Sequence, residues 1–293
     1  QDTAHKALLT NGLPFEITHF KYTRELLNTL PYDVETDCQT TQSAVVYGFM
    51  PTMQPPTTST NTTKYDAAYW YQKNGNMSLL HRNDDAGVTT QQEYTYSTAQ
   101  NNHLSSVTWN RPSQSFTETH GYTYDPTGNL LTDPKNGVTN IEYNSYNDLP
   151  KSIENATGVK RYRYNAQGMR LFKEASNSDR SYYIDGVVLN ADGDVVSYQT
   201  ATGYAVPYEV SHTIELDYFY YLKDWLGTVR GVLDADGTAL NANDHYPYGL
   251  RMPGRAFVTN SEGERYQFTG HEFDSETTYA YHGARDYNRE FNR

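Results

Sequence analysis

Cysteine is nearly absent from this sequence, since Cys38 is the only one among 293 residues. A single cysteine excludes an intrachain disulfide and a zinc site built from several thiolates. Long apolar runs are missing as well: residues 44–50 form one of the longest, far short of the roughly 20 residues with which a helix crosses a bilayer. The sequence therefore predicts no disulfide framework and no membrane span.

Positive charge is also scarce. Lys and Arg total 23 against 35 Asp and Glu, which gives a net charge of −12 with no block of like charge. Nucleic-acid binding depends on clustered Lys and Arg that neutralise phosphates. We therefore expect no nucleic-acid partner.

The motifs of common enzymes are missing too. There is no Gly-x-Ser-x-Gly elbow, no phosphate-binding glycine loop, and no second histidine after His271-Glu272 to complete a zinc-protease pattern. The neighbours of Cys38 offer no charge that would activate its thiol. Stretches that begin at Asn190 and Asp234 resemble the start of a calcium loop, but neither supplies the closing bidentate Glu. We therefore predict a protein that is not an enzyme, with no catalytic residues, no cofactor and no metal ligands.

Tyrosine, in contrast, is abundant: the chain has 28 tyrosines, and aromatic residues make up 14% of it. The overall hydrophobic fraction is only 37%. Tyrosine favours strands and combines a large apolar ring with a polar tip, so it can bury area on a partly wet sheet. This composition predicts an all-β protein with a large surface.

The tyrosines recur with a period of about twenty residues. Tyr124, Tyr143, Tyr164 and Tyr183 are separated by 19, 21 and 19 residues, the length of two short strands and two turns. Asn-Gly and Asp-Gly dipeptides, which suit two-residue hairpins, begin at Asn11, Asn74, Asn136, Asp185, Asp192 and Asp236. The spacing favours a repeated antiparallel sheet with the four tyrosines in one ladder, and an ordinary Tyr-rich β-sandwich is the alternative.

Residues 124–130 (Tyr-Asp-Pro-Thr-Gly-Asn-Leu) resemble the unit of the YD-repeat, or RHS-repeat, proteins. The RHS-repeat-associated core of that family is matched in order by residues 220–230, 246–249, 265–272 and 281–287. The resemblance covers residues 64–293. It implies an antiparallel Tyr-Asp-repeat β-sheet that spirals into a hollow shell or solenoid, closed at one end by the core region.

The chain is expected to divide into three regions. Residues 1–63 lack the repeat and would form a short irregular N-terminal arm, in which residues 21–30 predict a short helix and residues 50–63 a Pro/Thr-rich linker. The YD repeat would occupy residues 64–215. The RHS-repeat-associated core would occupy residues 216–293.

Toxin-carrying members of this family cut themselves with an aspartyl-type site just after the core, and the resemblance places Asn288 at one of its Asp positions. An amide cannot serve as a general acid or base, and Arg289 stands where the family has proline. We therefore predict no self-cleavage. Arg230, Arg285 and Asp224 are expected to be structural groups that fix the core, through a buried Arg–carboxylate pair.

Two functions of different class fit these observations. The first is a non-enzymatic extracellular or cell-surface structural module, a β-shell or fibre, that associates with copies of itself because the repeat array shows no cap at either end. The alternative is the shell or core portion of a polymorphic RHS toxin, which encapsulates and delivers a C-terminal effector. The sequence encoded after Arg293 would discriminate between them. Carbohydrate binding is a weaker third option, because the tryptophans are too dispersed to define a groove: Trp70, Trp109 and Trp225.

Overall fold

The computed structural model describes residues 64–291, except residues 98–101, 177–178, 261–262 and 264. This part of the chain contains 22 β-strands and no α-helix. The prediction of an all-β, antiparallel fold is therefore confirmed. The helix and linker predicted within residues 1–63 lie outside the described residues.

The strands form four sheets in which each strand pairs with its neighbours in sequence. A five-stranded sheet contains β1 (Ala67–Tyr71), β2 (Met77–Asn83), β3 (Thr89–Tyr96), β4 (Leu104–Arg111) and β5 (Phe116–Gly121). A two-stranded sheet contains β6 (Thr123–Tyr124) and β7 (Leu130–Thr132). A twelve-stranded sheet contains β8 (Val138–Tyr143), β9 (Pro150–Asn155), β10 (Gly158–Tyr164), β11 (Arg170–Ser176), β12 (Asp179–Ile184), β13 (Val187–Leu189), β14 (Val195–Gln199), β15 (Gly203–Val210), β16 (Thr213–Lys223), β17 (Val229–Leu233), β18 (Ala239–His245) and β19 (Arg251–Val258). A three-stranded sheet contains β20 (Glu272–Asp274), β21 (Tyr279–Tyr281) and β22 (Asp286–Asn288).

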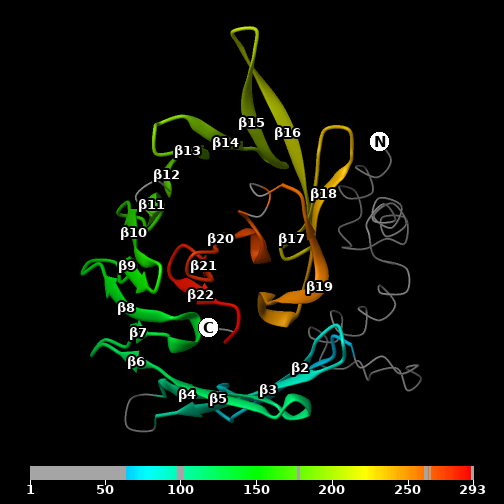
Figure 1. The fold of residues 1–293 in the computed structure, drawn as a ribbon. Helices are drawn as coiled ribbons and strands as arrows, with labels where there is room; N and C mark the ends of the chain where they lie inside the picture. Colours follow the sequence, from blue (N-terminus) through cyan, green and yellow to red (C-terminus); the bar gives the residue numbers. More distant parts are fainter. Residues whose placement is uncertain (1–63, 98–101, 177–178, 261–262, 264, 292–293) are drawn as a thin grey trace.

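Strands β1 to β19 follow one another around a curved wall, and β20–β22 lie inside its curve (Figure 1). In the described residues no hydrogen-bonded strand pair joins β1 to β19, so the wall is not a closed barrel. Its two ends meet through side chains instead. The Tyr65 hydroxyl donates to the Pro253 carbonyl at 2.9 Å, and the Tyr69 hydroxyl donates to the Pro247 carbonyl at 3.3 Å. The two ends of the array therefore contact each other within one chain.

A five-residue turn recurs along the wall and gives the repeat its local basis. Its first residue is Asp or Asn, whose side-chain oxygen accepts hydrogen bonds from the backbone N–H groups two and four residues later. In one copy, Asp125 Oδ1 accepts from Thr127 and Asn129 at 2.9 Å each, and Gly128 has a φ of 96° that favours glycine. The other copies begin at Asp84, Asn165, Asn190, Asp224 and Asp234.

This turn corrects part of the hairpin prediction. Asp185-Gly186 does form the two-residue connection between β12 and β13, with φ values of 48° and 83°. The dipeptides at Asp192 and Asp236 lie inside five-residue turns. In these turns the side chains of Asn190 and Asp234 accept hydrogen bonds from the backbone N–H groups two and four residues later. Of the others, Asn74 lies in a similar five-residue turn, Asn136 ends the 3₁₀ turn η2 (Pro134–Asn136), and Asn11 lies outside the described residues.

Tyrosine hydroxyls connect successive hairpins to one another. The hydroxyls of Tyr96, Tyr124 and Tyr143 donate to the carbonyls of Met77, Leu104 and Leu130 at 2.8, 3.0 and 2.8 Å, respectively. The tyrosines expected to form one ladder therefore have different partners along the wall. The Tyr164 ring lies 5.7 Å from that of Tyr281, and the Tyr183 hydroxyl donates to a carboxylate of β20.

The buried side chains form several clusters along the wall, and residues of β21 and of the segment after β22 contribute to two of them. Phe291 packs in one cluster with Val107 and Trp109, and Tyr279 packs in another with Ile153. The inner strands thus complete the cores of the wall. The boundary expected between residues 215 and 216 lies within β16, inside the twelve-stranded sheet.

Candidate functional site

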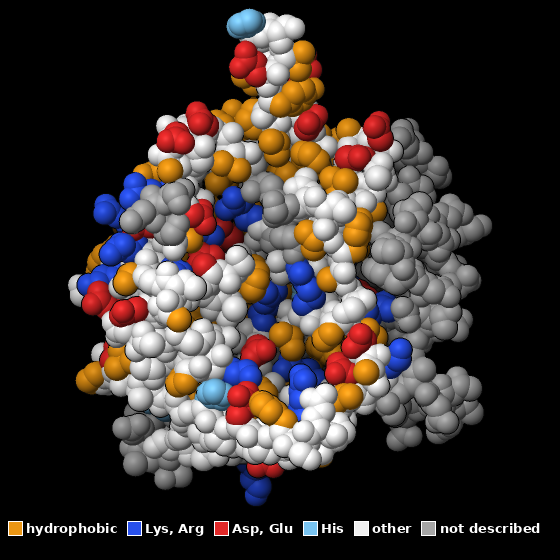
Figure 2. Space-filling view, viewed as in Figure 1, with side chains coloured by type: hydrophobic (Ala, Val, Ile, Leu, Met, Phe, Trp, Pro, Cys, Tyr) orange, Lys and Arg blue, Asp and Glu red, His pale blue; other side chains and the backbone are white. Residues whose placement is uncertain are grey.

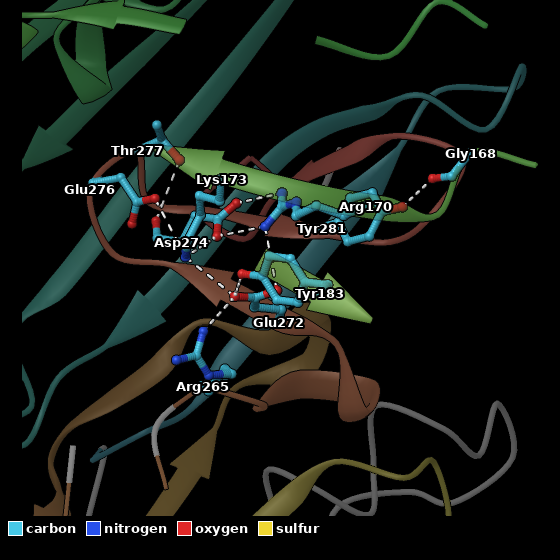
Figure 3. Close-up of polar contacts among 10 residues, drawn as sticks. All are labelled: Gly168, Arg170, Lys173, Tyr183, Arg265, Glu272, Asp274, Glu276, Thr277 and Tyr281. Atoms are coloured by element: carbon cyan, nitrogen blue, oxygen red, sulfur yellow. Dashed lines mark hydrogen bonds and ion pairs between the residues drawn. The ribbon is translucent and has the colours of Figure 1, made fainter. Parts of the chain in front are cut away.

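The inner strands meet the wall at a buried network of charged side chains, which is the candidate functional site (Figure 3). We call it the ion network. The wall contributes side chains from β11 and β12. Residues 265–291, which contain β20–β22 and which we call the inner unit, contribute side chains from β20 and from the segment before it. Its members are Arg170, Lys173, Tyr183, Arg265, Glu272 and Asp274.

The strongest contact of the ion network is a bidentate pair between Arg170 and Asp274. The Arg170 Nη1 and Nη2 atoms donate to Asp274 Oδ1 and Oδ2 at 2.8 and 2.7 Å. The two side chains are 2% and 1% exposed. A planar guanidinium matches a carboxylate in this geometry, which a lysine could not reproduce. This pair joins β11 of the wall directly to β20.

Glu272 is the second carboxylate of the ion network and accepts from three side chains. Its Oε1 atom accepts from Lys173 Nζ at 3.2 Å, from the Tyr183 hydroxyl at 2.6 Å and from Arg265 Nη1 at 3.1 Å. Lys173 also donates to Asp274 at 2.9 Å. Asp274 is therefore held by two donors of β11, whereas Glu272 is shared between donors of β11, β12 and the segment before β20.

Two aromatic rings lie close to the Arg170 guanidinium. Its Cζ atom lies 4.2 Å from the ring centre of Tyr281 and 4.9 Å from that of Tyr162. The Tyr281 hydroxyl donates to the Gly168 carbonyl in the turn before β11. Cation–π contacts of this kind are strongest when water is excluded, so the rings reinforce the same junction.

Burial and mutual charge together fix the protonation of the ion network. Burial by itself raises the pKa of Asp274, but the charges of Arg170 and Lys173 outweigh burial and hold that pKa below its usual value. Burial likewise lowers the pKa of Arg170 and of Lys173, yet Asp274 and Glu272 raise both pKa values well above their ordinary range. The four charged groups are therefore ionised at neutral pH.

Asp286, next to the ion network, is less well compensated. Burial raises its pKa to about 7, and the positive charge of Arg170 only partly offsets the effect. The Asp286 side chain has a buried Oδ1 atom for which the described residues provide no hydrogen-bond donor, although the residue as a whole is partly exposed. Burial also raises the pKa of Glu276, whose Oε1 atom lies 3.5 Å from Lys173 Nζ. This corner of the junction carries more carboxyl groups than its cations can match.

A second junction forms around Asp133, which is fully buried in the wall. Its Oδ2 atom accepts from the Tyr279 hydroxyl at 2.8 Å, from Asn288 Nδ2 at 2.9 Å and from Asn136 Nδ2 at 2.8 Å. The amide of Asn288 thus acts as a donor to a buried carboxylate. An Asp at that position would bring two carboxylates together.

The last described residues make a third junction with the wall. The Phe291 ring lies 5.3 Å from that of Trp109 and 5.2 Å from that of Tyr122, both edge-to-face. The neighbouring Arg289 is buried against the inner strands themselves: it donates to Gln267 Oε1 at 2.7 Å, and its Cζ atom lies 3.6 Å from the ring centre of Phe273 on β20. The inner unit is therefore held on several sides.

The core residues singled out from the sequence lie elsewhere. Arg230 donates to the Asn243 carbonyl at 3.0 Å and contacts Asp244, while its Nη1 atom is 3.9 Å from Asp224. Asp224 mainly caps its own turn, and Arg285 is exposed between β21 and β22. None of these three residues takes part in the buried bidentate pair, which Arg170 of the expected repeat region makes with Asp274 of the expected core.

Sequence reasoning missed Arg170, Lys173, Asp133 and Asp274. Arg170 follows a repeat turn at the first position of a strand, where a charged residue is ordinarily solvent-exposed. Glu272 lies within residues 265–272, which resemble part of the core, and this resemblance was the single sequence signal that pointed to the ion network. In the described residues no group of three or more His, Cys, Asp or Glu is placed to hold a metal ion, and no helix is long and apolar enough to cross a membrane.

No family model matches the chain, and no curated protein matches it. Among solved structures, the crystal structure of TcdB2-TccC3 is similar over 78% of this chain and 14% of that chain, with 15% identity and a TM-score of 0.49. The Tc holotoxin pore of Photorhabdus luminescens is similar over 80% of this chain and 14% of that chain, with 15% identity and a TM-score of 0.46. The chain thus spans about 14% of the length of either structure.

Proposed function

We propose that the chain is a non-enzymatic structural module of an extracellular or cell-surface protein, a curved β wall that holds its own C-terminal strands. The observation that carries this proposal is the ion network. Its charged side chains pair with one another across the junction between wall and inner unit, and they are buried. Charged groups that form their hydrogen bonds with one another stabilise the fold, whereas a catalytic site needs groups that are directed at a reactant.

The Asp133 junction supports the absence of self-cleavage. Two carboxyl groups of shifted pKa are needed for aspartyl-type acid–base chemistry. Here the Asp133 carboxylate is occupied by three donors, and one of them is the Asn288 amide. The test is to incubate the purified chain and follow its intact mass. We expect no change, and a defined fragment that appears with time and disappears after a single Asp substitution would overturn the proposal.

The alternative is the shell or core portion of an RHS toxin that encapsulates and delivers a C-terminal effector. The placement of Phe291 favours it, because this residue packs on the inner side of β4. A polypeptide joined beyond it would begin inside the curve of the wall. An unrelated domain encoded after Arg293, protected from protease in the native product, would support delivery over a purely structural role.

Association between copies of the chain remains a prediction, but the structure weakens the reason for expecting it. It was expected because the array showed no caps, yet the tyrosine contacts of Tyr65 and Tyr69 bring the two ends together within one chain. Light scattering across a wide concentration range tests it. A strict monomer would remove copies of the chain from the proposed partners.

A further inference from the structure

The hairpin of β15 and β16 projects beyond the rest of the wall (Figure 1). The neighbouring strand β14 pairs with only Tyr204 and Ala205 of β15, and β17 pairs with β16 from Tyr220 onward. In the part of the chain that the structure describes, no strand lies beside the outer portion of either strand, residues 206–210 and 213–219. Two open strand edges therefore reach into solvent.

The side chains that β16 contributes to one face of this hairpin are apolar, although Glu209 of β15 lies on the same face opposite Ile214. Ile214, Leu216, Tyr218 and Tyr220 alternate along β16 and share a face with Pro207, which pairs with Leu216. These four β16 side chains are 65%, 38%, 46% and 41% exposed. Hydrophobic side chains gather along the projecting hairpin in Figure 2. A contiguous exposed apolar face of this kind marks an interaction surface.

The two open edges differ in their hydrogen-bonding groups. The tip is a two-residue turn of Ser211 and His212, with φ values of 49° and 68°, so residues 210 and 213 bond to each other. Along an antiparallel pair, residue pairs that are hydrogen-bonded to each other alternate with pairs that are not. Ile214, Leu216 and Tyr218 belong to the pairs that are not, so their N–H and C=O groups point away from β15. The corresponding residue on β15 is Pro207, which has no N–H to donate. The edge of β16 is therefore available for pairing, whereas that of β15 is blunted.

The opposite face of β16 is acidic, with Glu215 and Asp217 two residues apart. Tyr208 lies across from Glu215 and donates to its Oε2 atom at 2.9 Å. In the antiparallel pairing of two copies that is centred on Leu216, Glu215 would lie directly opposite Asp217 of the partner, and like charges directly opposite are destabilising. Basic side chains would instead complement both carboxylates.

We propose that the outer edge of β16 is a docking site for an extended segment of another protein, in which apolar and basic residues alternate. Such a segment would add a strand, bonding to the outward groups of Ile214, Leu216 and Tyr218. Its apolar side chains would extend the exposed face, and its Lys or Arg side chains would lie beside Glu215 and Asp217. Strand addition obtains affinity from the backbone and specificity from alternate side chains.

The test uses the full chain and two labelled peptides of about nine residues, a length typical of a long strand. In one peptide valine and lysine alternate; in the other the same residues stand in two blocks. Fluorescence anisotropy should show binding of the alternating peptide at least tenfold tighter than that of the block peptide. Equal binding of the two peptides, or no binding of either, would overturn the proposal.

Two variants separate the backbone from the charges. Leu216→Pro removes an outward N–H without breaking a bond to β15, and should weaken binding of the alternating peptide at least tenfold. Leu216→Ala keeps the N–H and should reduce the affinity less. The double variant Glu215→Gln, Asp217→Asn should weaken binding severalfold and remove its salt dependence. Full binding by a folded Leu216→Pro chain contradicts the proposal. So does a dimer in light scattering that this variant abolishes, because the occupant would then be a second copy.

Discussion

In the wall, the hydrogen bonds that define each turn join residues two to four positions apart, as between Asp125 and Asn129. In the inner unit, the bonds that hold β20–β22 join residues far apart in sequence, 104 positions for Arg170 and Asp274 and 155 for Asp133 and Asn288. The wall contacts are mostly exposed and repeated, while the inner contacts are buried and each occurs once. Losing one turn contact should therefore matter little, whereas losing one inner contact should be costly.

The largest effect is expected from Asp274→Ala. It leaves the Arg170 guanidinium buried without its bidentate partner, which typically costs about 3–5 kcal/mol of the free energy of unfolding. Urea denaturation measures the loss. The matched control is Glu142→Ala, which removes an exposed ion pair with Lys151 at 3.1 Å and should leave the midpoint nearly unchanged. Equal effects of the two variants would erase the distinction between inner unit and wall.

The ring of Tyr143 tests a wall contact that links successive hairpins. It is half-buried on β8, and its hydroxyl bonds to the Leu130 carbonyl. Tyr143→Ala should cost about 2 kcal/mol, below the range for a fully buried ring. Tyr143→Phe keeps the ring and should cost about 1 kcal/mol, the value of one hydrogen bond. A loss below about 0.5 kcal/mol for the alanine variant would show that the ring contributes little.

Much of the wall could be predicted from the sequence, and little of the site could. Turn residues such as Asp125 and Gly128 act at fixed short offsets, so their spacing carries the information. The alternation of a strand also indicates which tyrosines share a face. Nothing local marks Arg170 as buried or pairs it with Asp274, since that depends on how far the wall curves before the chain returns inside it. Asn288 was noticed as an amide, but its partner Asp133 was not.

Asn288→Asp should destabilise the Asp133 junction in a pH-dependent manner. Two carboxyl groups in contact cannot both ionise readily, so the folded pair binds a proton that the unfolded chain has released. The free energy of unfolding of the variant then falls as the pH rises from about 4, and at pH 7 it is about 2 kcal/mol lower than at pH 4. Thermal unfolding from pH 4 to 8 measures this. The control Asn288→Ala also loses the amide donor, but its loss should not grow with pH.

Asp286→Asn should stabilise the chain, whereas Asn288→Asp should destabilise it. Because burial raises the pKa of Asp286 to about 7, the folded state keeps a proton that the unfolded state loses near pH 4, and stability declines between these values. A pKa rise of this size corresponds to at most about 4 kcal/mol. Because Asp286 is partly exposed and water screens its charge, we expect the variant to raise the free energy of unfolding by about 1–2 kcal/mol at pH 8 and to change it little at pH 4. A gain of equal size at both pH values would mean that the effect does not come from this ionisation.

The smallest effect is expected in a single repeat turn. Asn190 Oδ1 accepts from the backbone N–H groups of Asp192 and Asp194 at 2.9 Å each, at an exposed position. Asn190→Ala frees both donors to water, so we expect a loss of about 0.5 kcal/mol, well below the value of a buried hydrogen bond. Asn190→Asp keeps the acceptor, as Asp125 and Asp234 do in equivalent turns, and should cost less still. Native-state hydrogen exchange at residues 192 and 194 would locate the effect. If the alanine variant instead loses as much as Asp274→Ala, the turns are not independent local units and the wall folds as a single cooperative body.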